Sequence, residues 1–110
     1  MPHVIQRDAR SDVFSAIAHP VRRQLLDLLV TGDQPVRSLA AHFATTRPAI
    51  SQHLRILLDA GLVTERRAGR ERHYRLQAER LQEVESWVRH YEGFWRQKLS
   101  ALNTYLDTLP

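Results

Sequence analysis

One stretch, residues 45–63, constrains the fold of this chain more than any other: T-T-R-P-A-I-S-Q-H-L-R-I-L-L-D-A-G-L-V. Thr46 is a favoured N-cap residue, and Pro48 falls in the first turn, where a missing backbone N–H breaks no helical hydrogen bond. The apolar positions then recur at spacings of four, three and four, as on the buried face of a helix: Ile50, Leu54, Leu57 and Gly61. The sequence therefore predicts a helix that begins after Thr46 and packs one face against a core.

The opposite arc of this helix is polar and carries Pro48, Ser51, Gln52, Arg55 and Asp59. Glutamine and arginine side chains can pair bidentately with base edges in the DNA major groove, and serine can donate or accept a hydrogen bond there. The arc therefore fits a helix that reads DNA. A solvated surface face has the same composition, so the rest of the chain must decide between the two interpretations. His53 lies beside the buried face, which favours packing against a neighbouring helix over base contact.

Composition places the chain among small globular proteins. Its 110 residues, 43% of them apolar, suffice for one domain with one core. The chain has no cysteine, which excludes a disulfide, a thiolate metal site and a cysteine nucleophile. No apolar run is long enough to cross a bilayer and the N-terminus shows no signal-peptide pattern, so we expect a cytoplasmic protein. Residues 1–10 show no clear pattern, and we expect them to be partly disordered.

The charge balance is basic. Lysine plus arginine number 16 against 12 aspartates and glutamates, and the isoelectric point is about 10.3. Lys98 is the single lysine in the sequence, so nearly all the positive charge is carried by arginine, the side chain best suited to bidentate phosphate and base contacts. Basic composition alone is weak support for nucleic-acid binding, but it agrees with the polar arc of the central helix.

Further helices are predicted before this stretch. One covers residues 12–18, a second begins at Pro20 and stops near Gly32, and a third of about two turns begins at Val36. The second helix is expected to bury Val21, Leu25, Leu28 and Leu29. Two short helices joined by a tight turn, the second with a polar outer face, form a helix-turn-helix.

A β-hairpin is predicted after the central helix, with strands over residues 62–67 and 70–76 around Ala68-Gly69. Its tip is dense in charge, with Glu65 and Glu71 against Arg66, Arg67, Arg70 and Arg72. A hairpin directly after a helix-turn-helix is a wing, and its arginines are placed to reach phosphates or a narrow minor groove. The alternative is a charged edge that discourages aggregation.

The C-terminal segment, residues 78–109, carries an apolar stripe at spacings of three and four over about eight turns. Such a helix exceeds the size of the small domain, and Gly93 is a candidate for a bend. The stripe needs a partner, either a second copy of the chain or the first helix of the same chain. The dimer-interface residues predicted from this stripe and from the first helix are Phe14, Leu81, Val84, Val88, Tyr91, Trp95, Leu99 and Leu102.

Four segments resemble the ArsR/SmtB family of winged helix-turn-helix repressors: A-I-A-H-P-V-R-R-Q-L-L-D-L-L (16–29), R-S-L-A-A-H-F (37–43), R-P-A-I-S-Q-H-L-R-I-L-L-D-A-G-L-V (47–63) and R-R-A-G-R-E-R-H-Y-R-L (66–76). The resemblance implies a mainly α fold with a β-hairpin wing, homodimeric through its terminal helices, that represses transcription from a palindromic operator in double-stranded DNA. Residues 1–110 are then one domain, with a DNA-binding core at 12–76 and a dimerisation helix at 78–109. The DNA-contacting residues expected are Thr46, Arg47, Pro48, Ser51, Gln52, Arg55, Arg66, Arg67, Arg70 and Arg72.

The sequence departs from the metal-sensing members of that family. Their helix before the recognition helix carries paired cysteines, whereas residues 38–43 here contain none. Zinc sensors of the family use an Asp-x-His pair and a later histidine on the C-terminal helix, where this chain has His90 with Glu92 nearby. The chain therefore resembles the subgroup without recognised metal sites, and we expect no metal and no cofactor.

Two other interpretations remain open at this stage. One is a ligand-responsive sensor of the same fold, whose effector, unknown from the sequence, sits near Trp87, Phe94 and Trp95. The other is an interaction module that has lost DNA binding, for which acidic residues are expected where Gln52 and Arg55 stand. An enzyme is not predicted, because the sequence shows no Ser/His/Asp signature and no phosphate-binding loop.

Overall fold

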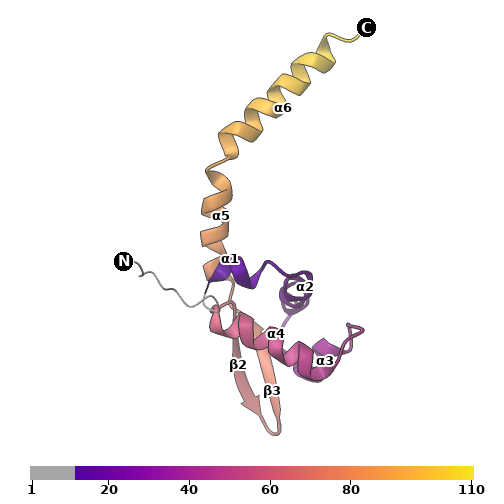
Figure 1. Cartoon of the computed structure of the whole chain (residues 1–110), viewed down its shortest axis with the longest axis vertical. Helices are drawn as coiled ribbons and strands as arrows, with labels where there is room; N and C mark the ends of the chain where they lie inside the picture. Colours follow the sequence, from indigo (N-terminus) through magenta and orange to yellow (C-terminus); the bar gives the residue numbers. More distant parts are fainter. Residues whose placement is uncertain (1–11) are drawn as a thin grey trace, which may run out of the picture.

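The computed structural model describes residues 12–110, so the disorder expected at residues 1–10 lies outside the described residues. The elements follow the order expected of a winged helix-turn-helix (Figure 1): α1 (Val13–Ala16), α2 (Pro20–Leu29), β1 (Gln34–Pro35), α3 (Val36–Ala40), α4 (Arg47–Asp59), β2 (Val63–Ala68), β3 (Glu71–Leu76), a short 3-10 helix (Ala78–Arg80), α5 (Leu81–Arg89) and α6 (Glu92–Asp107).

Side chains cap the first turns of α2 and α4. Thr46 Oγ1 accepts a hydrogen bond from the Ala49 N–H at 3.2 Å, which confirms the predicted start of α4. His19 caps α2 in the same way, because its Nδ1 accepts from the Val21 N–H at 3.1 Å. These local bonds fix where α2 and α4 begin, and so set which residues of α4 face outward.

The core lies between α2, α3, α4 and the sheet. In α4 the predicted apolar face is confirmed for Ile50, Leu54 and Leu57, which have no exposed surface, but Gly61 lies beyond the end of the helix at φ +75°. In α2 the prediction was partly wrong: Leu26 is buried together with Leu25 and Leu29, whereas Val21 and Leu28 are only half-buried. The difference follows from α2 packing against both α4 and β3, which widens its buried arc.

The sheet has three strands in the order β1-β3-β2, all antiparallel. The hairpin is confirmed, but its two-residue turn is Gly69-Arg70 rather than Ala68-Gly69, with Gly69 at φ +66°. The predicted first strand also begins one residue later, at Val63. Strand β1 was not predicted, and it pairs Gln34 with Tyr74 and Pro35 with His73. Through this pairing the segment before α3 holds the wing against the helical core.

The C-terminal segment is two helices, so the prediction of one long helix was wrong. The break falls at His90 and Tyr91, where backbone N–H groups bond three residues back, and Gly93 lies inside α6. Helix α5 lies against its own chain, with Leu81 and Val84 packed on the core, whereas all of α6 is exposed and projects away from the body (Figure 1). The radius of gyration, 19.1 Å, exceeds the roughly 13 Å expected for a compact chain of about this length.

Two glycines allow a matched test of the left-handed backbone conformation that follows α4. Gly61 has φ +75°, and an added Cβ would lie 3.1 Å from Arg80 Cδ. We expect Gly61→Ala to lower the free energy of unfolding by about 1–2 kcal/mol, because a left-handed backbone is strained for alanine. Gly93→Ala is the control, since an added Cβ there meets nothing within 4 Å in a helix.

The control variant is expected to raise helical content by circular dichroism without lowering the melting temperature, because alanine favours the helix over glycine. Thermal melts of both variants decide the matter. An equal loss of stability in the two would contradict the role assigned to the Gly61 conformation.

Candidate nucleic-acid interface

The outward face of α4 is set by the burial of its opposite face. Because Ile50, Leu54 and Leu57 point into the core, Ser51, Gln52 and Arg55 point away from it and are exposed. Asp59, which the sequence placed on the same arc, is instead half-buried, and its Oδ1 lies 3.4 Å from Arg55 Nε. That pair is worth little in water, so it leaves the Arg55 guanidinium able to reach another partner.

A cleft between the beginning of α4 and the wing brings together four of the ten predicted DNA-contacting residues, two from the helix and two from the hairpin. It has a volume of about 240 Å³, and its lining residues are Pro35, Val36, Arg47, Ser51, Arg70, Glu71 and Arg72. Residues predicted from the helix and residues predicted from the hairpin therefore share one concave, strongly basic surface. All ten predicted DNA-contacting residues are exposed, and whether they contact DNA stays a prediction.

The wing arginines do not act as one cluster, because the hairpin register separates them. Arg67 and Arg72 are paired across the strands and share one face, whereas Arg66 and His73 share the other. Arg66 Nε lies 3.8 Å from Asp33, which also binds Arg75 at 3.1 Å. Arg66 therefore lies near the start of β1, while Arg70 occupies the turn at the tip.

Glu71 of the cleft and its partner Arg37 were not identified from the sequence as functional. Arg37 in α3 binds both carboxylate oxygens of Glu71 in β3, with Nε–Oε2 at 2.5 Å and Nη2–Oε1 at 3.4 Å. The hydrogen bond from Arg37 lowers the pKa of the Glu71 carboxyl, and the charges of Arg37, His73 and Arg47 lower it further. The sequence showed Glu71 as one charge at the tip, but nothing in it indicated that α3 reaches this carboxylate.

Helix α4 is fixed to α1 and α2 through one guanidinium. Arg22 donates to the Ala16 carbonyl at 2.6 Å and lies 3.1 Å from His53 Nδ1. The His53 ring also packs on His19, with ring centroids 4.5 Å apart, so His53 packs against a neighbouring helix as predicted. Burial lowers the pKa of His53, and the nearby His19 and Arg22 lower it further.

Some features expected of other protein classes are not found in the described residues. Within residues 12–110, no group of three or more histidine, aspartate or glutamate side chains is arranged to hold a metal ion. No helix in that range has the length and apolar character needed to cross a membrane.

Comparison with known proteins agrees with this geometry. The sequence profile of the bacterial regulatory protein, arsR family, matches residues 19–65, which span α2 to the start of the wing. The transcriptional repressor SdpR of Bacillus subtilis is 38% identical over 81 residues, 74% of this chain and 90% of that protein. The chain belongs to the ArsR family.

Solved structures of ArsR-type regulators extend the similarity to the fold. A crystal structure described as a possible transcriptional regulator for arsenical resistance is 40% identical, with a TM-score of 0.67 over 94% of this chain and all of that one. A homodimeric winged helix-turn-helix DNA-binding domain from Mycobacterium bovis is 32% identical, with a TM-score of 0.60 over 77% of each chain. The family and these relatives are transcription regulators and not enzymes, and the M. bovis domain is a winged helix-turn-helix, the element order found here.

The histidine contacts of α4 predict a pH-dependent stability. Because the pKa of His53 is lowered in the folded chain, the unfolded chain binds a proton more readily. The free energy of unfolding should therefore fall as the pH drops through about 6.5 and level off below the folded-state pKa. Replacing His53 with Gln should flatten this part of the pH profile.

The matched control is His42→Gln, because His42 is exposed in the turn after α3. Urea denaturation of wild type and both variants at several pH values between about 5 and 8 measures the effect. If His53→Gln and wild type lost the same stability over that interval, His53 would not be the titrating group.

Proposed function

We propose that this ArsR-family chain is a homodimeric repressor that binds a palindromic operator through α4 and the wing. The observation that carries the proposal is the exposed polar face of α4 beside an arginine-lined cleft. In such a dimer two copies of α4 enter successive major grooves on one side of the duplex, about 34–36 Å apart. Bound over a promoter, the dimer represses by blocking polymerase, and its site of action is the cytoplasm.

The DNA contacts divide into two kinds. Gln52 and Arg55 extend from the exposed face of a helix held rigidly by the core, which suits reading of base edges. Arg47 lies in the first turn of α4 and Arg70 at the tip of the wing, where a guanidinium meets phosphate most readily. Thr46, Pro48 and Ser51 complete the helix surface, and Arg67 and Arg72 complete one face of the wing.

The dimer interface that we propose is the apolar stripe of α5 and α6. Its α6 part follows spacings of four, three and four, as in a coiled-coil seam, through Trp95, Leu99, Leu102 and Leu106, and Leu109 continues the spacing just beyond the end of the helix. These side chains are about half or more exposed, although a helix of this length alone in water is only marginally stable. The homodimeric M. bovis relative supports a second copy as the partner.

The α5 part of the stripe is shared between the two chains. Leu81 and Val84 pack on the core of their own chain, while Val88 and Tyr91 are exposed. Phe14 of α1 extends this surface, because its ring meets Trp87 edge-on with centroids 5.7 Å apart. Both alternatives weighed from the sequence therefore have support: part of the segment covers its own chain, and the remainder is available to a second copy.

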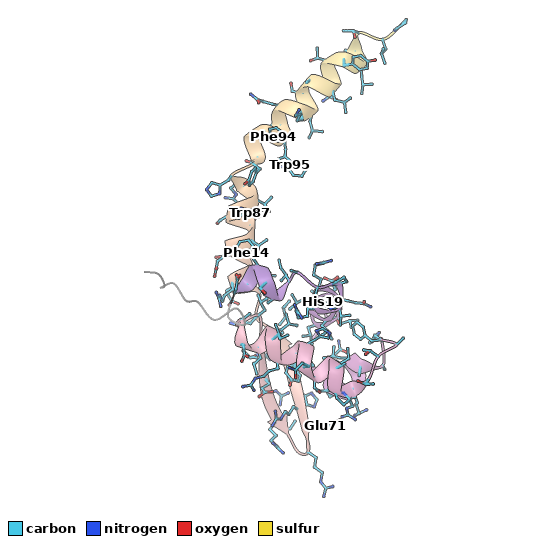
Figure 2. The ribbon with its side chains drawn as sticks, viewed as in Figure 1. Phe14, His19, Glu71, Trp87, Phe94 and Trp95 are labelled. Carbon is cyan, nitrogen blue, oxygen red and sulfur yellow. The ribbon has the colours of Figure 1, made fainter. Side chains whose placement is uncertain are left out.

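A second candidate function, response to a small apolar ligand, has one specific observation in its favour. Where α5 meets α6, an apolar hollow of about 300 Å³ is lined by Trp87, Val88, Tyr91, Phe94 and Trp95. Figure 2 shows the labelled aromatic side chains around this junction. A ligand bound there should change tryptophan fluorescence and DNA affinity at the same concentration, whereas a repressor without an effector should show neither change.

Substitutions on α4 and on the wing should weaken DNA binding in different ways. Gln52→Ala or Arg55→Ala should cost about 1–3 kcal/mol at the operator and much less on scrambled DNA, because base contacts are lost. Arg70→Ala or Arg72→Ala should weaken both duplexes about equally and flatten the salt dependence by about one unit per lost phosphate contact. Affinities measured across a salt series, with thermal melts to confirm folding, distinguish the two patterns.

The opposite pattern would contradict the assignment. If Arg55→Ala weakened both duplexes equally while Arg70→Ala weakened the operator alone, the wing would be reading sequence through the minor groove. Ser51→Ala is a milder companion to Gln52→Ala, since its short hydroxyl offers a single weaker contact.

The dimer proposal is tested by placing a charge in the α6 seam. Leu102→Glu puts a carboxylate in the middle of the stripe, and we expect it to shift the protein toward monomer in sedimentation at micromolar concentration. Thr104→Glu adds the same charge on the opposite side of the helix and should remain dimeric. A wild-type monomer at that concentration, or equal dissociation of the two variants, would rule out the seam as the interface.

A further inference from the structure

Glu71 places a carboxylate inside the basic cleft between α4 and the wing. The other charged residues that line the cleft are Arg47, Arg70 and Arg72. Glu71 is the first residue of β3, and Figure 2 shows it toward the tip of the hairpin. An anion therefore already lies where the proposed function requires DNA phosphate to approach.

The Glu71 carboxylate has close partners on α3 and on its own strand. Arg37 of α3 contacts both of its oxygens, at 2.5 and 3.4 Å. His73 lies two residues further along β3 on the same face, and its Nε2 is 3.9 Å from Glu71 Oε1. The guanidinium fork that binds a carboxylate in this way is the same fork that binds a phosphate.

The contact between Arg37 and Glu71 is accessible from solvent. The exposed fraction is 65% for the Arg37 side chain and 34% for that of Glu71. A phosphate can therefore reach Arg37, but it must either displace the carboxylate or bind beside it. Like charges a few ångströms apart repel, so either arrangement lowers the affinity of the cleft for DNA.

We propose that Glu71 is an intramolecular competitor of the DNA backbone phosphate. Its carboxylate binds Arg37 and partly offsets the positive charge of Arg47 until a phosphate displaces it. This inference rests on the proposed function and adds a feature of the chain that limits its affinity for DNA. The competition acts on any duplex, so Glu71 keeps non-specific affinity low and reduces the number of phosphates that the chain neutralises. Low non-specific affinity matters because a genome offers a large excess of competing sites.

A purely structural role for Glu71 predicts a different result. In that case the pair with Arg37 only braces β3 against α3, and losing it loosens the wing and weakens DNA binding. Glu71→Gln separates the two roles, because the amide oxygen still accepts a hydrogen bond from Arg37 while the negative charge is removed.

The experiment compares wild type, Glu71→Gln and Glu79→Gln. Glu79 is exposed in the 3-10 helix beyond the far end of β3, so its variant makes the same charge change away from the cleft. Affinity is measured for a random-sequence duplex of about 30 base pairs, long enough for two half-sites, and for an operator-containing duplex over a salt series. Thermal melts confirm that all three proteins are folded.

We expect Glu71→Gln to bind both duplexes about three- to tenfold more tightly at low salt, with Glu79→Gln close to wild type. The salt dependence should become steeper by about 0.9 for the one phosphate contact added in each protomer, which is about 1.8 for the dimer. Adding Arg37→Ala to Glu71→Gln should return the slope to the wild-type value, because the released Arg37 makes the added contact.

Failure of this inference can be told apart from failure of the proposed function. If wild type binds DNA and Glu71→Gln binds equally or more weakly, or if Glu79→Gln gives the same gain, the competition is overturned and the proposed function stands. If wild type binds neither duplex at any salt concentration, the proposed function and this inference fail together.

Discussion

The burial of one face of α4 is the constraint on which the rest of the structure depends. Ile50, Leu54 and Leu57 leave no surface exposed, and this fixes the rotation of the helix about its own axis. Once that rotation is set, Gln52 and Arg55 can only point outward. The hydrophobic effect thus determines which polar residues are exposed. Large apolar side chains set the orientation of α4, and the polar residues between them form its outward face.

The wing depends on the same core but is held less tightly toward its tip. Val63 and Tyr74 are buried at the base of the hairpin, and β1 adds a third strand beside β3. Toward the tip the contacts are exposed ion pairs, such as Arg37–Glu71, which individually add little stability. The base is therefore rigid while the tip is held by charges, an arrangement that allows arginines to adjust to a phosphate backbone.

Local signals account for what the sequence predicted. The Thr46 cap, the proline in the first turn and the spacing of Ile50, Leu54 and Leu57 specify α4 without reference to the rest of the chain. Strand β1 was not predicted because it is two residues long and forms only through its pairing with β3. The break at His90 and Tyr91 carries no proline, and the apolar periodicity continues across it.

The candidate site was predicted in its parts but not in its arrangement. Each exposed residue of α4 and the wing could be identified from sequence, because helical and hairpin periodicity places it on a face. The cleft that joins Arg47 to Arg70, and the reach of Arg37 to Glu71, depend on contacts more than twenty residues apart in the chain. Such contacts leave no periodic signal, so only the folded structure reveals them.

The central claim is that two copies of α4 read two half-sites of one duplex. Selection of bound fragments from random-sequence DNA, followed by sequencing, tests it most directly. The account predicts enrichment of an inverted repeat whose half-site centres lie about one helical turn, 10–10.5 base pairs, or a multiple of it, apart. Recovery of sequences with no shared motif, or of a single half-site without a symmetric partner, would contradict it.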